Sequence, residues 1–438
     1  MSPGPSNEEV LAAIANRPQS EVQGLQLVDT DVFIAGSGPI ACTYARKIIE
    51  SGAKVLMAEI GSQDSPIVGE HHKNSIKYQR DIDAFVNVIR GALQNISTPP
   101  ADTFIPTLGG NGWTPSSLDS LIFRGSNPNQ ERDVNLKASA VTRTVGGMAT
   151  HWTCACPFPD AEERKENPIN KVEFDKLLQN AYEILNVHPN EYNDSIRHTV
   201  VKEKLLETLP ASRRVQNLPL AVERRTDNPY YVTWTGSDTV LGDAVHNPNF
   251  QLRDETRVTR LVYDNLNPDI IKGALVKDLR KELNYVVRAK VYVVACGAIG
   301  TPQILANSGL QHSLPALGRN LCEQSLAFCQ IVLKREIVDS IPLNPKFAER
   351  VAEHKKNHPK DPLPIPFPDP EPQIMIPYTP EFPHHVQVHR DAFSYGDVGP
   401  RADSRVVVDL RFFGKQDINE NNLVYFGSRE SPKSGWLP

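Results

Sequence analysis

The chain has 438 residues, of which 39% are hydrophobic and 23% are charged, and its formal net charge is -5 at pH 7. This length is sufficient for two globular domains with a large hydrophobic core. The small net charge and the scattered Lys and Arg residues argue against a nucleic-acid partner, and the apolar runs are too short for a membrane span.

The beginning of the chain shows no secretory signal. Residues 1–24 lack a basic start followed by an apolar stretch, so we expect a propeptide or a flexible N-terminus there. The six cysteines are scattered among apolar residues, and buried thiols are expected rather than a disulfide framework.

The first ordered element is a βαβ unit. The apolar segment Asp31–Ala35 predicts one strand, and Lys54–Glu59 predicts the next. A helix is expected between them because apolar residues recur at helical spacing, at Ala41, Ala45, Ile48 and Ile49, and Gly52 stands where that helix would stop. The two strands should lie parallel and buried.

The turn between the first strand and the helix has the sequence Gly36-Ser37-Gly38-Pro39-Ile40-Ala41, which fits the dinucleotide-binding pattern G-x-G-x-x-A. Gly36 would permit the tight turn, Gly38 would let the backbone approach a pyrophosphate, and Ala41 would keep the helix close to the strand. Glu59 ends the next strand and can accept hydrogen bonds from ribose hydroxyls. This pattern predicts a dinucleotide without separating NAD from FAD, and a plain glycine turn is the alternative.

The middle of the chain predicts helices and then short strands. Helices are expected between Glu162 and Glu207, for example around Phe174–Leu185. The strands are separated by turn residues and predict a meander that leads into a buried strand; they are Phe250–Arg253, Arg257–Tyr263, Ile271–Val276, Tyr285–Val287 and Val291–Ala295.

Residues 346–385 form a distinct segment. It begins with a charged helix candidate, Phe347–Lys356, and becomes Pro-rich from Pro359 to Pro383, a composition that favours extended chain. We interpret the segment as an inserted surface lobe, and a linker is the alternative. Two strands should follow, at Val386–His389 and Arg405–Phe413.

The strand Val291–Ala295 ends in Cys296-Gly297 and leads into a helix candidate. This arrangement, the meander before it and the later segment Leu317–Leu321 resemble flavoproteins of the glucose-methanol-choline (GMC) oxidoreductase family. The resemblance implies FAD as the cofactor, with Cys296 and Gly297 beside it. The implied fold is α/β: an FAD-binding, Rossmann-like parallel sheet domain plus a substrate domain with a mostly antiparallel sheet.

A second motif surrounds His151. Two adjacent glycines stand shortly before Thr150-His151-Trp152-Thr153, and paired glycines let the backbone pack flat beside a planar ring. On chemistry alone, His151 is either a buried structural histidine or a nucleophile or ligand. The string resembles the motif in which the fungal sugar oxidases called pyranose 2-oxidases join a histidine covalently to the flavin. The resemblance implies covalent FAD on His151, with Thr153 near the reactive edge of the flavin, where it could tune reoxidation. It places these residues beside the cofactor too: Thr144, Gly147, Trp152 and Cys154.

A third segment, from Gln387 to Gly396, resembles the substrate strand and mobile loop of the same oxidases. Gln387 and His389 are two apart on a strand and therefore face one side, where they could hydrogen-bond sugar hydroxyls. The resemblance adds three substrate-binding loop residues, Asp391, Phe393 and Tyr395. A surface strand and turn is the alternative. The next strand carries Asp409 and Arg411, which could position the loop or form a cross-strand ion pair.

Taken together, these resemblances imply oxidation of an aldopyranose such as D-glucose at carbon 2, with oxygen reduced to hydrogen peroxide, by a homotetramer. The expected parts are a flexible 1–24, an FAD domain of 25–155 and 246–325, and a substrate domain of 156–245 and 326–438. Another flavin alcohol oxidase or dehydrogenase and an inactive flavin-binding remnant are the alternatives. A cytoplasmic or hyphal periplasmic location is favoured over classical secretion.

The resemblance extends from about Val28 to about Gly414. The family continues with a His–Asn pair opposite the flavin, for which residues 415–438 offer no counterpart. We therefore expect a C-terminally shortened chain with no assigned catalytic base and little oxidase activity. No metal site is expected, because the histidines and cysteines lack the usual ligand spacings.

Overall fold

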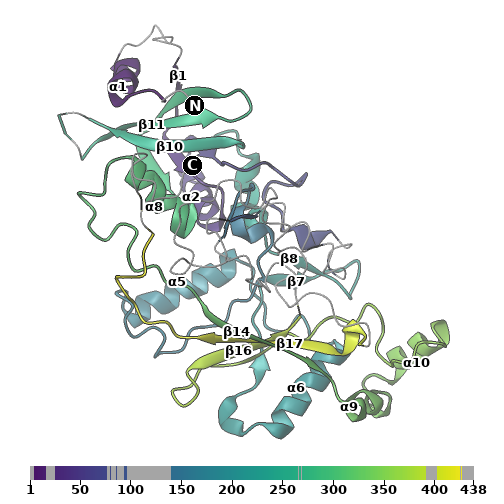
Figure 1. The fold of residues 1–438 in the computed structure, drawn as a ribbon. Coiled ribbons are helices and arrows are strands. Elements are labelled where there is room, and N and C mark those ends of the chain that lie inside the picture. The colour runs from purple at the N-terminus through teal and green to yellow at the C-terminus, as the bar shows by residue number, and fades with distance from the viewer. Residues whose placement is uncertain are drawn as a thin grey trace, which may run out of the picture.

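A computed structural model describes residues 4–15, 25–75, 140–264, 266–267, 269–390, 402–424 and 426, together with 79, 85 and 93–95. Figure 1 shows the sheets that build on the predicted βαβ unit at one end of the molecule and a separate antiparallel sheet at the other. The architecture is mixed α/β, with a parallel sheet plus antiparallel sheets, as the sequence predicts.

The parallel sheet has the strand order β13-β2-β3-β9. Its strands are β2 (Val32–Ala35), β3 (Val55–Ala58), β9 (Phe250–Arg253) and β13 (Val291–Val294). Every residue of β2 and β3 is buried, so the expectation of two parallel buried strands is confirmed. Both faces are covered, which explains why these strands are continuously apolar rather than alternating.

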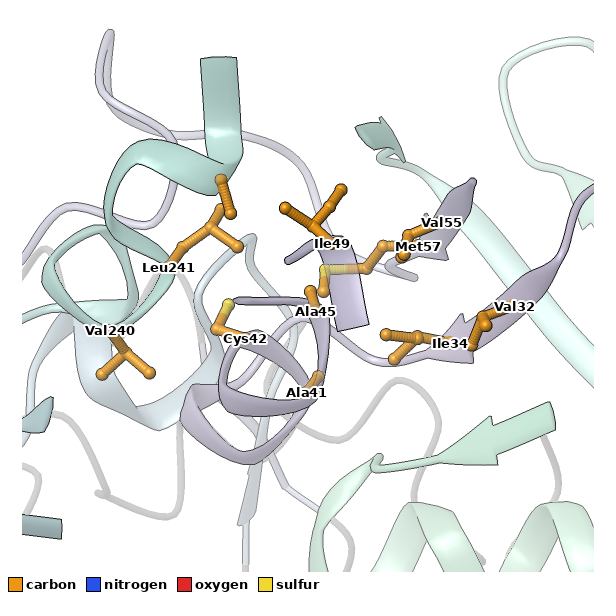
Figure 2. Packing of buried hydrophobic residues seen from close by; sticks show 11 residues of the cluster. Val32, Ile34, Ala41, Cys42, Ala45, Ile49, Val55, Met57, Val240 and Leu241 are labelled. Carbon is orange, nitrogen blue, oxygen red and sulfur yellow. The ribbon is translucent and has the colours of Figure 1, made fainter. Parts of the chain in front are cut away.

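Helix α2 (Pro39–Ile49) connects β2 to β3 and covers one face of this sheet. Figure 2 shows its Ala41, Ala45 and Ile49 between the strand residues and Leu241 of α7 (Ser237–Leu241). Small alanines on the inner face let α2 approach the strands closely. Burying a side chain such as Ile49 stabilises this packing by roughly 1.5–3 kcal/mol. The helical spacing of the apolar residues therefore predicts which face of α2 packs on the sheet.

A second sheet of order β1-β12-β11-β10 packs on the other face of β2 and β3. It consists of β1 (Gln26–Asp29), β10 (Thr256–Tyr263), β11 (Ile271–Asp278) and β12 (Leu283–Arg288). Helix α8 (Gly297–Asn307) follows β13 and adds Ile304 to the same core. The meander is therefore present, but Phe250–Arg253 is not part of it: β9 pairs parallel with β3 instead.

The N-terminal helix α1 (Asn7–Ala15) corrects, for its own residues, the expectation of a flexible N-terminus. Val10 of α1 is fully buried against the second sheet, in a cluster with Val262, Leu275 and Val286. The predicted buried thiols also need correction, because Cys322 and Cys329 are exposed. Cys329 lies on β14, an edge strand with solvent on one side. All six cysteines are free.

The third sheet is antiparallel, with the order β14-β17-β16-β15-β6. Its strands are β6 (Gln216–Asn217), β14 (Ser325–Val332), β15 (Ile374–Ile376), β16 (His384–His389) and β17 (Val407–Gly414). Helix α6 (Ile196–Thr208) packs its Val201 on the apolar face formed by residues such as Val388 and Val408. The opposite face is polar and carries Gln387 and His389.

Residues 346–385 contribute directly to this sheet, which rules out the linker alternative. The segment supplies β15 and buries Phe347, Ile365 and Asp369. Its helix α10 (Ala348–Asn357), together with α9 (Arg335–Ser340), lies at the far edge of the molecule in Figure 1. The Asp369 carboxylate accepts the Ile196 and Arg197 N–H groups at 2.9 and 3.0 Å, so the segment caps the start of α6.

The remaining elements connect these sheets. They are helix α5 (Lys171–Ile184) and two small antiparallel ribbons, β4 (Leu93–Asn95) with β5 (Ala140–Thr142) and β7 (Val222–Arg224) with β8 (Val232–Trp234). The helix predicted around Phe174–Leu185 is α5, one of the elements that the apolar spacing located correctly. No helix in the described part of the chain is long and apolar enough to cross a membrane.

Candidate active site

The turn after β2 has the geometry that a dinucleotide-binding loop requires. Gly36 has φ +95°, and a Cβ there would collide with the carbonyl oxygen of Ala295 at the end of β13. A Cβ on Gly38 would meet no atom within 4 Å, so the backbone there borders open space. Helix α2 begins at Pro39 without a side-chain cap, which leaves its first N–H groups available to an anion such as a pyrophosphate.

Glu59 is buried at the end of β3 and holds the same loop. Its Oε2 accepts hydrogen bonds from Ser37 N (3.1 Å) and Ser37 Oγ (2.8 Å), and its Oε1 accepts one from Gly61 N (2.9 Å). Burial raises the pKa of the carboxyl, and these donors oppose that shift. The predicted ribose-binding carboxylate therefore already fixes the dinucleotide loop, an arrangement that the pattern alone did not reveal.

The double-glycine turn before His151 docks on this loop. Gly146 has φ +100° and Gly147 has φ +57°, and a Cβ on Gly147 would lie 3.1 Å from the Gly38 Cα. The Gly146 N–H donates to Ser37 Oγ at 2.9 Å, and the Gly146 carbonyl accepts from Ser237 Oγ at 2.8 Å. Ser37 thus bridges Glu59 and the His151 motif, which brings two predicted cofactor-binding segments together.

His151 is buried, and its hydrogen bonds define its tautomer. Its Nδ1 lies 3.0 Å from Thr150 Oγ1, while that hydroxyl donates to the Gly147 carbonyl at 2.9 Å. The hydroxyl can therefore only accept from Nδ1–H, which leaves the lone pair on Nε2, 3.4 Å from Thr142 Oγ1. Burial, followed by the neighbouring His72, lowers the pKa of His151 to about 4. In this tautomer the neutral imidazole has its proton on Nδ1 and its lone pair on Nε2.

The residues after His151 are held rigidly. The Trp152 indole Nε1 donates to the Thr235 carbonyl at 2.7 Å, and the Ala221 N–H donates to the Cys154 carbonyl at 2.8 Å. Cys154 is fully buried at φ +56°, and burial raises the pKa of its thiol well above the usual value. The Cys154 side chain therefore belongs to a hydrophobic core, whereas the Thr153 side chain is half-buried and partly exposed at the surface of the site.

Thr144, Cys296 and Gly297 complete the predicted cofactor set. Thr144 Oγ1 donates to Asp64 Oδ2 at 2.8 Å, so its hydroxyl serves the protein framework. Cys296 precedes α8, and burial raises the pKa of its thiol to about 12, which keeps it protonated. Gly297 adopts φ +78° at the first position of that helix.

Two of the predicted sugar-binding residues, Gln387 and His389, share one face of the third sheet. Gln387 and His389 are buried, and their cross-strand partners on β17 are Arg411 and Asp409. Asp409 accepts a hydrogen bond from its cross-strand neighbour Gln330 on β14 at 3.1 Å. These side chains form a concentrated polar patch whose apolar reverse side packs on α6. Asp391, Phe393 and Tyr395 lie outside the described residues.

A cavity of about 320 Å³ lies beside the third sheet, and its lining includes neither His151 nor Gln387 and His389. It is lined by the chain that follows the His151 motif, including Phe158 and Arg164, and by Met375 and His385 of β15 and β16. The His385 ring lies 3.3 Å from the Gln387 amide nitrogen, and Met375 shares a core cluster with Cys154. A volume of this size is in the range of small-ligand pockets.

Two features of the site were missed from sequence. Ser37 occupies a variable position of G-x-G-x-x-A, so only its contacts reveal the bridge to Gly146. His71 contacts the Trp152 carbonyl from a loop with no recognisable pattern. In the part of the chain that the structure describes, no group of three or more His, Cys, Asp or Glu residues could hold a metal ion.

Comparison with known proteins identifies the relatives of this chain. The family model described as GMC oxidoreductase matches residues 226–326. A pyranose 2-oxidase of Tricholoma matsutake is 62% identical over 403 residues, which cover 91% of this chain and 71% of that protein. A pyranose 2-oxidase of Lyophyllum shimeji is 43% identical, over 90% of this chain and 72% of that protein.

Solved structures agree at the level of the fold. A formate oxidase of Aspergillus oryzae superposes with a TM-score of 0.55 at 13% sequence identity, over 93% of this chain and 76% of that chain. At this level of sequence identity the superposition supports only the fold of the chain. A C-glycoside 3-oxidase of Microbacterium trichothecenolyticum is 33% identical, over 91% of this chain and 74% of that protein.

Proposed function

The chain belongs to the pyranose 2-oxidase family of GMC oxidoreductases, and from that membership we propose that it catalyses FAD-dependent oxidation of aldopyranoses at carbon 2. The products are a 2-keto sugar and hydrogen peroxide. The observation that carries the proposal is the His151 motif, docked through Gly146 and Ser37 on a dinucleotide loop whose Gly38 borders open space.

The residues present fit FAD. Gly38 and the uncapped start of α2 would hold the pyrophosphate, and Glu59 lies at the strand end where ribose hydroxyls are recognised. The chemistry that FAD supplies when bound is acceptance of a hydride from a C–OH carbon, with oxygen as the final electron acceptor. The protein supplies position and electrostatics around that chemistry.

We assign covalent attachment of FAD to His151. Its Nε2 carries the lone pair because Nδ1–H is taken by Thr150, and the lowered pKa keeps the ring neutral at ordinary pH. Trp152 and Thr153 follow on a backbone fixed by Thr235 and Ala221. Thr153 would lie at the reactive edge of the flavin and influence its reoxidation.

Sugar binding is assigned to the polar face of the third sheet. Gln387 and His389 present an amide and an imidazole on one side of β16, and both can hydrogen-bond sugar hydroxyls. Asp391, Phe393 and Tyr395 follow in sequence and would cover the bound ring. His151 lies in a loop beside the dinucleotide-binding turn, whereas Gln387 and His389 lie on β16 of the third sheet. The reaction therefore requires the flavin site and the sugar site to face the same space. A homotetramer, the assembly implied by the family resemblance, is part of this proposal.

Acid precipitation of the purified protein tests the attachment. Wild-type protein should retain its yellow chromophore in the pellet, whereas His151→Ala should release it into the supernatant. The expected reason is that alanine offers no nucleophile while leaving the neighbouring hydrogen bonds of Trp152 in place. Wild-type protein that released all of its flavin would refute the covalent assignment.

Product analysis tests the reaction itself. Glucose should generate peroxide together with the 2-keto sugar, identified by nuclear magnetic resonance of the product. The 33% identity to a C-glycoside 3-oxidase makes oxidation at carbon 3 the second candidate, and the same spectra distinguish the two positions. Flavin-containing protein that neither becomes reduced by glucose nor forms peroxide would refute the oxidase assignment in favour of the inactive flavin-binding remnant named above as an alternative.

A further inference from the structure

A buried imidazole, His71, contacts the backbone of the His151 motif. Its Nε2 lies 2.9 Å from the Trp152 carbonyl oxygen, and its Nδ1 accepts the Lys73 backbone N–H at 3.1 Å. Because Nδ1 is already an acceptor, the proton of the neutral ring must be on Nε2, which therefore donates to Trp152. Burial holds the pKa of His71 well below its usual value, so this tautomer persists at ordinary pH.

The His71 ring is itself fixed by its surroundings. Its centroid lies 5.5 Å from that of Trp234 and 6.1 Å from that of Phe85. The Lys73 ammonium lies over the same two rings, at 4.4 and 5.0 Å. Asn74 pairs with both backbone groups of Trp234, at 2.7 and 3.0 Å. The loop that carries His71 is thereby fastened to β8, and the donor has little freedom to move.

The group that His71 contacts is part of the backbone of the His151 motif. The Trp152 carbonyl belongs to the peptide that leads into Thr153, and the Trp152 N–H belongs to the peptide that follows His151. His71 holds this residue at its carbonyl and Thr235 holds it at its indole. The His71 hydrogen bond therefore restrains the backbone directly after His151, while the His151 ring itself contacts Thr150 and Thr142.

We propose that His71 is a positioning residue for flavin attachment, acting through the Trp152 carbonyl to hold His151 Nε2 at its reacting partner. This inference rests on the proposed attachment at His151. In that attachment a bond forms between Nε2 and a carbon of the flavin. The Nδ1 proton of His151 and one hydrogen of that carbon would leave, and molecular oxygen would take both, with two electrons, as hydrogen peroxide. A misplacement of about 1 Å can reduce such a reaction roughly a hundredfold.

Two substitutions separate the hydrogen bond from the packing. His71→Phe keeps an aromatic ring between Trp234 and Phe85 but removes the donor, and His71→Gln restores an N–H near the position of Nε2. The rate of covalent attachment is measured by adding FAD to protein produced without flavin and quantifying acid-stable flavin over time. His71→Phe should slow attachment about 10- to 100-fold, and His71→Gln should recover most of that loss.

His198 provides a matched control. It is also buried, accepts the Gln373 N–H at Nδ1 (3.2 Å) and lies 3.1 Å from Asn217 Oδ1 through Nε2. His198→Phe should lower stability comparably and leave the attachment rate at the wild-type value. Attachment by His71→Phe at the wild-type rate, or an equal loss in His198→Phe, would overturn the positioning role. Wild-type protein without acid-stable flavin would instead refute the attachment at His151, a separate outcome.

Discussion

Replacing Ser37 with alanine should loosen the joint between the dinucleotide loop and the His151 motif. The Ser37 hydroxyl donates to Glu59 Oε2 at 2.8 Å and accepts the Gly146 N–H at 2.9 Å, and all three groups are buried. Ser37→Ala removes both bonds with one atom and opens little space. The effect therefore measures polar contacts rather than a cavity.

The magnitude follows from the groups left behind. An unsatisfied buried N–H at Gly146 costs about 1–3 kcal/mol, and the lost bond to Glu59 costs about 1–2 kcal/mol more. Glu59 retains Ser37 N and Gly61 N as donors, which limits the second loss. We expect Ser37→Ala to lower the free energy of unfolding by about 2–4 kcal/mol and to weaken flavin retention.

Denaturant unfolding of flavin-free protein measures the first effect, and the flavin-to-protein ratio after gel filtration measures the second. Ser51→Ala is the matched control, because Ser51 Oγ donates to the Ile48 carbonyl at 2.7 Å in an exposed position. Its unfolding free energy should change by less than about 0.5 kcal/mol. If Ser37→Ala were no more destabilising than Ser51→Ala, the proposed joint would be incorrect.

Two further predictions concern charge. The pKa values of His151 and His198 are each lowered to about 4, mainly by burial, so the unfolded chain takes up protons at a higher pH than the folded chain does. The free energy of unfolding should consequently fall as pH drops from about 6.5 toward 4, by up to about 3 kcal/mol per histidine. Unfolding measured between pH 7 and 4.5 should show a smaller pH dependence for His198→Gln. An unchanged dependence would contradict this prediction. Arg405 donates to both oxygens of buried Asp361 at 2.6 and 3.0 Å, so Arg405→Ala should cost about 3–5 kcal/mol. The exposed pair Arg335–Asp339 is the control, because Arg335→Ala should change the free energy of unfolding by less than about 1 kcal/mol. Equal urea midpoints for Arg405→Ala and Arg335→Ala would refute the larger contribution of the Arg405 pair.

The sequence by itself determined the parts whose signals are local. The βαβ unit was predictable because apolar runs and helical spacing directly reflect burial, and the G-x-G-x-x-A turn because only glycine tolerates φ +95° at Gly36. The motif around His151 identified a candidate attachment residue for the same reason, since its residues are contiguous. The polar alternation of Gln387 and His389 predicted one face of a strand correctly.

The tertiary structure decided what depends on distant contacts. Phe250–Arg253 reads as one more strand of a meander, and only its backbone pairing with β3 places it in the parallel sheet. The N-terminal helix is short, and the burial of Val10 against the second sheet depends on contacts with distant strands that local sequence could not indicate.

The supports of the site belong to the same class. The Ser37–Gly146 bond spans 109 residues and the His71–Trp152 bond spans 81, and each depends on the folded path of the chain between its ends. A serine or histidine has no periodicity and no fixed partner spacing, so its role appears only when folding brings a buried donor within about 3 Å of a buried acceptor. Local residues therefore specified the chemistry, and long-range packing specified the geometry in which that chemistry is held.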